Sequence, residues 1–121
     1  MTTKCVPTIA VFPEERLTLS EKVEKWTYQL CNILEENYNK SYPNSSVPVT
    51  FSMELGRKYW KINQNSGGVH AFIDRNTGEV YKPASWRGPA KHVRYDLRII
   101  NQRQECFENA DWAGGYLYLK G

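Results

Sequence analysis

Residues that mark disulfide frameworks and metal sites are scarce in this sequence of 121 residues. It contains three cysteines and two histidines, and no Cys-x-x-Cys pair. Disulfide scaffolds and zinc sites show several such residues at short, regular spacing. We therefore expect the cysteines to be unpaired thiols, and we predict no metal site and no cofactor.

Long apolar runs are absent as well. No run approaches the roughly 18 to 20 residues that cross a bilayer. The apolar stretch near the start is interrupted by Pro7 and Pro13, which makes it too broken for a secretion signal. We expect a protein that is neither secreted nor membrane-bound and that works in the cytoplasm of whatever cell makes it.

Motifs of nucleotide binding and catalysis are missing too. The sequence has no Gly-x-Gly-x-x-Gly loop and no phosphate-binding loop of the Gly-Lys-Ser type. Ser85 and Cys106 are candidate nucleophiles and His92 is a candidate base, but no nucleophile elbow or cysteine motif surrounds them. We therefore assign no catalytic residue and expect a protein that is not an enzyme.

Residues 18 to 40 carry the clearest structural signal. Thr18 followed by Glu21 is the signature of a capping box at a helix start. Apolar residues then recur at spacings of three and four, which places them on one face of a helix. This face comprises Leu19, Val23, Trp26, Leu30, Ile33, Leu34 and Tyr38. We expect it to pack on the protein's own sheet.

Alternating apolar and polar residues predict strands over 49–56 and 58–64 and a hairpin over 69–82. Asn76 and Gly78 supply the residues that a short strand connection requires. Helix followed by strands predicts an α+β fold, with one long amphipathic helix packed on an antiparallel sheet of four to five strands.

The sequence predicts a short N-terminal segment followed by one domain. Residues 1–17 are expected to be an arm or an edge strand, and residues 18–121 a single domain. The last strand of that domain is expected in "YLYLK", residues 116–120.

Positive charge is concentrated between residues 82 and 103. Six basic residues and a single acid, Asp96, lie there, although the net charge of the whole chain is only +3. Pro89 suits the first turn of a helix, so a short basic helix over about 88 to 95 is the favoured interpretation. A turn or strand is the other, because Val93, Tyr95 and Leu97 alternate with polar residues.

This basic segment, residues 82–98, is the candidate contact surface. Lysine and arginine neutralise phosphates, and aromatic rings stack on unpaired bases. The candidate nucleic-acid-binding residues are Lys82, Trp86, Arg87, Lys91, Arg94 and Arg98. An assembly adaptor that forms a homodimer through its sheet is the alternative. The exposure of Trp86 separates a stacking role from a packing role.

Residues 69–94, VHAFIDRNTGEVYKPASWRGPAKHVR, contain a hydrophobic strand, then Asp-x-x-Thr-Gly-x-Val, then Lys-x-Ala-Ser-Trp-x-x-Pro-Ala-Lys-His-x-Arg. This block resembles one in small uncharacterised proteins of tailed bacteriophages, marine ones among them. Those proteins carry the block after a helix and two strands and often end in a similar Tyr-Leu-basic tail. They have Gly-Asn where this chain has Tyr95-Asp96. The resemblance implies a phage or phage-like origin and implies no activity.

Overall fold

The computed structural model describes residues 16–65 and 67–118. Its elements, in chain order, are α1 (Leu19–Ser41), β1 (Phe51–Leu55), β2 (Tyr59–Gln64), β3 (Val69–Asp74), β4 (Glu79–Tyr81), β5 (Pro83–Ser85), β6 (Gly88–Pro89), β7 (Tyr95–Asp96), α2 (Ile100–Asn109) and the short 3-10 helix η3 (Gly115–Leu117). The predicted arm lies outside the described residues up to residue 15.

The long helix α1 begins at the predicted capping box. The Thr18 amide donates to the Glu21 carboxylate at 2.9 Å, and the Glu21 amide donates to the Thr18 hydroxyl at 3.3 Å. These reciprocal bonds satisfy amide groups that a helix start leaves without partners. The predicted apolar face is buried at Val23, Leu30 and Leu34, which confirms both the helix and its orientation.

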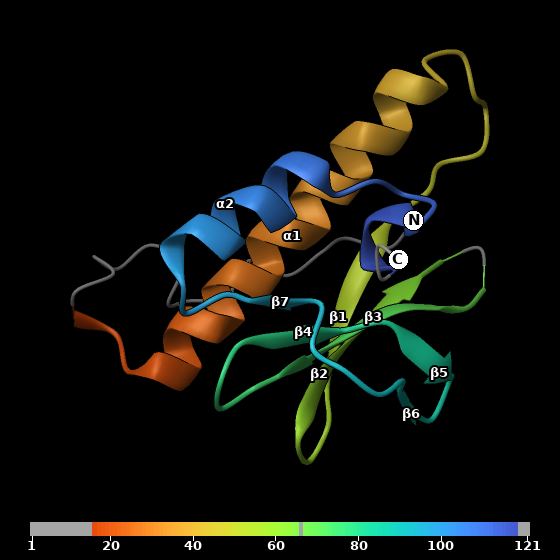
Figure 1. Ribbon diagram of the computed structural model, residues 1–121. Helices are drawn as coiled ribbons and strands as arrows, with labels where there is room; N and C mark the ends of the chain where they lie inside the picture. The colour runs from red at the N-terminus through yellow and green to blue at the C-terminus, as the bar shows by residue number, and fades with distance from the viewer. Residues whose placement is uncertain (1–15, 66, 119–121) are drawn as a thin grey trace.

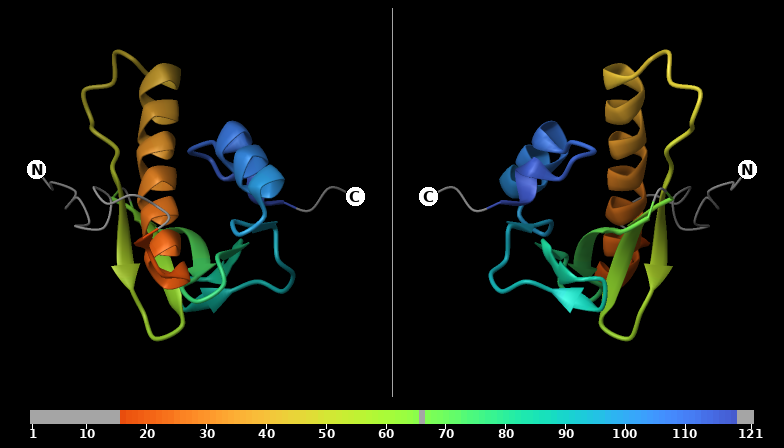
Figure 2. Two further views of the ribbon diagram at one scale, coloured as in Figure 1. Left: turned by 90° about the vertical axis from the view of Figure 1, so that its left-hand side faces the viewer. Right: turned by 90° about the vertical axis from the view of Figure 1, so that its right-hand side faces the viewer.

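Five strands form one antiparallel sheet in the order β1-β2-β3-β4-β7. Both helices lie on one side of this sheet, and the β5–β6 hairpin lies on the other (Figures 1 and 2). We call these the inner and the outer face. The predicted α+β fold is therefore confirmed, with the larger of the two expected strand numbers.

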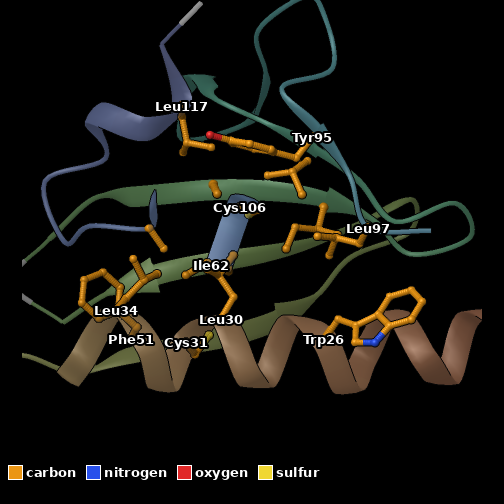
Figure 3. Packing of buried hydrophobic residues seen from close by; sticks show 14 of the residues in the cluster. Trp26, Leu30, Cys31, Leu34, Phe51, Ile62, Tyr95, Leu97, Cys106 and Leu117 are labelled. Carbon is orange, nitrogen blue, oxygen red and sulfur yellow. The ribbon is translucent and has the colours of Figure 1, made fainter. Parts of the chain in front are cut away.

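The hydrophobic core fills the space between the helices and the inner face (Figure 3). Phe51 and Ile62 meet the apolar side of α1 there, and Leu97 and Cys106 bring the end of the sheet and α2 into the same cluster. Burying one such side chain contributes about 1.5–3 kcal/mol to folding. Arg103 joins the two helices, because its guanidinium lies 4.3 Å from the Trp26 ring.

A β-bulge interrupts the pairing of β2 with β3. Ile62 pairs with Ala71, yet Asn63 pairs with Val69, so His70 is an additional residue on β3. Such a residue changes the alternation of side chains along its strand. His70 therefore points inward next to Ala71, with its ring centroid 5.3 Å from that of Phe51.

The structure corrects the expectation for the basic segment. The helix favoured over about 88 to 95 is wrong, because Gly88 and Pro89 form a strand that pairs with β5. The Ala90 amide donates to the Lys82 carbonyl and the Arg94 amide to the Val80 carbonyl, both at 2.7 Å. These backbone amides are thus bonded to neighbouring strand segments, and the turn interpretation holds.

Two further differences lie near the C-terminal end. The sequence pattern predicts no separate element at α2, which has no side-chain cap and a single buried residue, Cys106. The expected last strand is wrong at residues 116 and 117, which lie in η3, because Gly114 adopts a left-handed φ of 82° and turns the chain. Residues 119 and 120 of that prediction lie outside the described part of the chain.

We expect Gly78→Ala to destabilise the fold. Gly78 has a φ of 83°, and an added Cβ would lie 3.3 Å from Leu97 Cβ and 3.4 Å from Val23 Cγ2. The left-handed backbone and the tight contact together should lower the free energy of unfolding by about 1–3 kcal/mol in urea denaturation. Gly88→Ala is the control, because its Cβ would meet no atom within 4 Å. Equal stability of the two variants would contradict this account.

Candidate nucleic-acid interface

The outer face of the sheet gathers aromatic rings and basic side chains around Lys61. Lys61 of β2 pairs with Phe72 of β3, and both side chains point away from α1. Phe72 is buried, because the β5–β6 hairpin lies against this part of β3. The Lys61 ammonium lies 5.8 Å from the Phe72 ring and 5.2 Å from the Trp86 ring.

Trp86 is located in the turn at the tip of the β5–β6 hairpin, and 64% of its surface is exposed. The Arg87 guanidinium lies 5.1 Å from the indole, so two cations flank one exposed ring. The turn is held by the Arg87 amide, which donates to the Ser85 hydroxyl at 3.2 Å. An exposed ring beside cations is the arrangement that a stacking role requires.

Two shallow cavities adjoin at Lys61. One, of about 330 Å³, is lined by the basic residues Arg57, Lys58, Lys61 and Arg87 and by one carboxylate, Glu54. The other, of about 390 Å³, shares Lys61 and Glu54 and reaches Trp86. The Asn63 side-chain Nδ2 donates a hydrogen bond to the Glu54 carboxylate at 3.0 Å, so the charge of Glu54 is partly engaged. The cavities together form a positively charged groove across β2, which we call the Lys61 groove.

Only part of the predicted set lies at this groove. Trp86 and Arg87 do, whereas Lys91 is exposed in the loop beyond β6 and is absent from the walls of both cavities. Lys82 faces a different cavity, with its ammonium 4.8 Å from the Tyr118 ring. The structure thus divides the basic segment between separate regions of the surface.

Arg94 and Arg98 are engaged within the protein. The Arg94 guanidinium donates to the carbonyl oxygens of Leu117 at 2.6 Å, of Lys91 at 2.6 Å and of His92. Arg98 forms a two-point ion pair with Asp96, at 2.7 and 3.0 Å. The same guanidinium lowers the pKa of Asp96, which keeps that carboxylate charged. We leave both arginines out of the candidate surface.

Sequence reasoning missed Lys61, Lys58 and Arg57, which lie on β2 and in the turn before it. A signal was present in the alternation of Trp60 and Ile62 with Lys61, since it places the lysine on the face opposite the core. What the sequence could not supply was the hairpin that brings Trp86 next to it.

The candidate nucleophiles are occupied or protonated. Burial raises the pKa of the Cys106 thiol to about 12, so it stays neutral and unreactive at neutral pH. The Ser85 hydroxyl accepts the hydrogen bond that closes the hairpin turn. In residues 16–65 and 67–118, no group of three or more His, Cys, Asp and Glu could hold a metal ion.

His70 is the buried titratable group that the groove does not use. Its Nε2 lies 2.8 Å from the Tyr116 hydroxyl. Burial lowers the pKa of His70 from 6.5 to about 4, although the nearby carboxylate of Asp111 acts in the opposite direction. Burial also raises the pKa of Tyr116 well above its ordinary value, so the phenol stays protonated.

Arg94→Lys should lower stability although it preserves the charge. A lysine cannot reproduce the planar, multi-donor contact with the carbonyls of residues 91, 92 and 117. We expect a loss of about 1–3 kcal/mol in the free energy of unfolding, measured by urea denaturation. Arg87→Lys is the control, since Arg87 is exposed and its guanidinium bonds no carbonyl. A wild-type stability for Arg94→Lys would show that its contacts contribute little.

His70 should make the fold sensitive to mild acid. His70 takes up a proton near pH 6.5 in the unfolded chain but only near pH 4 in the folded protein. The free energy of unfolding is therefore highest above pH 6.5, and it falls as the pH decreases toward 4 because protons bind preferentially to the unfolded chain. Between about pH 7 and about pH 5 we expect a loss of about 2 kcal/mol in urea denaturation. His70→Gln should flatten this dependence. An unchanged slope in that variant would assign the acid sensitivity to other groups.

Comparison with known proteins places the chain in a family but assigns no activity. Residues 11–119 match DUF7717, a family of unknown function, and the chain belongs to this family. No curated protein matches the chain, and no solved structure does. Within the described residues, no helix has the length and apolar character needed to span a membrane.

Proposed function

We propose that this protein is a non-enzymatic binding module that holds unpaired nucleic acid in the Lys61 groove. The observation that carries the proposal is the exposed indole of Trp86 between two cations, with Lys61 at 5.2 Å and Arg87 at 5.1 Å. Large exposed aromatic rings next to basic groups are typical of surfaces that stack bases and neutralise phosphates.

The aromatic component favours single strands over duplexes. In a duplex the base faces are covered by their neighbours, whereas an unpaired base can lie flat on an indole. Such a stack contributes about 1–3 kcal/mol per base and tolerates any base. On binding, a base would replace one cation on the Trp86 ring, and the released ammonium or guanidinium would move to a phosphate.

The electrostatic component comes from the cavity wall. Arg57, Lys58, Lys61 and Arg87 line one continuous depression, so a backbone that crosses β2 would meet them in succession. Each phosphate neutralised releases counterions, which makes affinity fall with salt. Arg94 and Arg98 add nothing to this component, because their guanidinium groups are already bonded within the protein.

The biological setting is proposed from the sequence resemblance alone. We place the protein among small accessory proteins of tailed phages, acting in the cytoplasm of the host cell. A second candidate function, self-association as an adaptor, is favoured by the edge position of β1, where Leu55 is 55% exposed. Among the described strands β1 ends the sheet, and an end strand with an exposed apolar side chain is a feature of strand-to-strand pairing.

We expect labelled single-stranded oligonucleotides to bind more tightly than duplexes in fluorescence anisotropy, with affinity falling steeply as salt increases. Trp86→Ala should weaken binding about tenfold or more, and Trp86→Phe should retain most of it because a ring remains. Lys61→Gln and Arg87→Gln should each remove about one phosphate contact, which lowers the slope of log affinity against log salt concentration by about one.

Lys91→Gln is the matched control for these variants. It removes one charge from the same segment at a residue that lines neither cavity of the groove, so binding should change less than about twofold. Absence of binding at about 50 mM salt, or full binding by Trp86→Ala, would reject the proposal. A mass that rises with protein concentration, in the absence of such binding, would support the adaptor.

A further inference from the structure

A third cavity, of about 220 Å³, lies at the end of the sheet away from the charged wall of the Lys61 groove. Three segments line it: the Gly67–Gly68 turn between β2 and β3, the chain at Lys82 and Pro83 where β5 begins, and residues 112–114, 117 and 118 around η3. The imidazole of His70 reaches this cavity from β3. The function proposed above does not use Lys82 or His70, which line this cavity.

The bulge in β3 places His70 where its two ring edges meet different surroundings. The side chain is only 8% exposed, and its Nε2 is bonded to the Tyr116 hydroxyl. A Cβ added to Gly114 would lie 3.7 Å from His70 Cε1 and 4.0 Å from Nδ1. The Cε1–Nδ1 edge therefore faces Gly114, which is part of the cavity wall.

Hydrogen bonding assigns the tautomer of this imidazole. The described residues offer the Tyr116 hydroxyl no acceptor other than His70 Nε2, which favours the tautomer in which the phenol donates and Nε2 accepts. The proton of the neutral ring is then on Nδ1. No buried side-chain nitrogen or oxygen of the described residues lacks a partner, yet Nδ1 bonds no protein acceptor, so Nδ1 is open to the cavity.

Lys82 supplies a second donor at the same cavity. Its ammonium lies 4.8 Å from the Tyr118 ring, and its carbonyl is fixed by the hydrogen bond from the Ala90 amide at 2.7 Å. None of the lining residues is acidic. Asp111, the carboxylate that acts on His70, is instead held by the Gly115 amide, whose bond to Oδ1 is 3.2 Å. A cation and an N–H donor thus line a space whose walls hold no carboxylate, and Asp111 lies behind them near His70.

We infer that this cavity binds a small oxyanion, with the Lys82 ammonium and His70 Nδ1–H as its two donors. Charge-assisted hydrogen bonds of this kind are the strongest that a neutral imidazole and a lysine can offer to an anion. The apolar walls of Pro83 and Leu117 restrict the occupant to a compact group. The inference does not depend on nucleic-acid binding.

Two kinds of ligand could supply the oxyanion bound in this cavity. It can be a free anion, or it can be the terminal phosphate of a strand in the Lys61 groove. The second source follows from the walls that the cavity shares with the one beside Trp86, namely Gln64, Gly68 and Val69. Inorganic phosphate and a single strand with or without a 5′-phosphate separate the two.

Side-chain ¹⁵N NMR of the two histidines tests the inference directly. The free protein should show His70 protonated at Nδ1 and not at Nε2. Inorganic phosphate at near-neutral pH should shift the His70 resonances saturably and leave those of the exposed His92 unchanged. Lys82→Gln should weaken this response about tenfold, and Lys91→Gln should leave it intact.

The outcomes are distinct from those of the nucleic-acid test. Saturation by free phosphate that persists in Trp86→Ala establishes a free-anion site even if the groove binds no strand. A response only to the 5′-phosphorylated strand, lost in Lys82→Gln, establishes the site with the strand as its source. A proton on Nε2, equal shifts of His70 and His92, no response to either probe, or a full response in Lys82→Gln would overturn the inference.

Discussion

Both candidate sites depend on the single additional residue in β3. A strand that alternated regularly would direct His70 outward and would shift the residues before it to the opposite face. Because the bulge absorbs one residue, Val69 and Phe72 both remain on the outer face with Lys61 and Asn63, while His70 and Ala71 both point inward. The outer surface and the buried imidazole are therefore two results of one local irregularity, and bulges of this kind commonly re-aim side chains next to functional sites.

The β5–β6 hairpin determines which side chains of the outer face are covered and which are exposed. It covers Phe72, which would otherwise expose a large apolar ring, and it carries Trp86 out to solvent at its tip. The hairpin is short, so its position depends on anchors on both sides: the Ala90 and Arg94 amides bond strand segments, and the Arg94 side chain bonds the carbonyl of Leu117. A ring that is exposed yet borne on an anchored turn loses little freedom when a ligand stacks on it, which favours binding.

Local signals explain which elements the sequence predicted. The capping box at Thr18 and the spacing of apolar residues after it are complete within one helix, and the strands follow from alternation. The helix α2 was missed because Ile99 gives no side-chain cap and Cys106 alone is buried, so neither a start signal nor an apolar stripe exists. The helix predicted over about 88 to 95 was wrong because Pro89 suits a helix start and an edge strand alike, and here it lies in a strand. The partnership of Lys61 with Trp86 joins residues far apart in the chain, and only the folded hairpin reveals it.

Of the six candidate residues chosen from the sequence, only Trp86 and Arg87 lie at the Lys61 groove, and part of the reason is general. An arginine is equally suited to a phosphate and to a backbone carbonyl that has lost its partner at a turn. In this fold the chain after β7 and the chain after α2 present such carbonyls, and Arg103 and Arg94 bond them at Leu97 and Leu117. A basic side chain is more readily available to a ligand where the carbonyl groups around it already have partners. Lys61 lies within a paired strand and Arg87 within a closed hairpin turn, and that is why their charges remain directed at solvent.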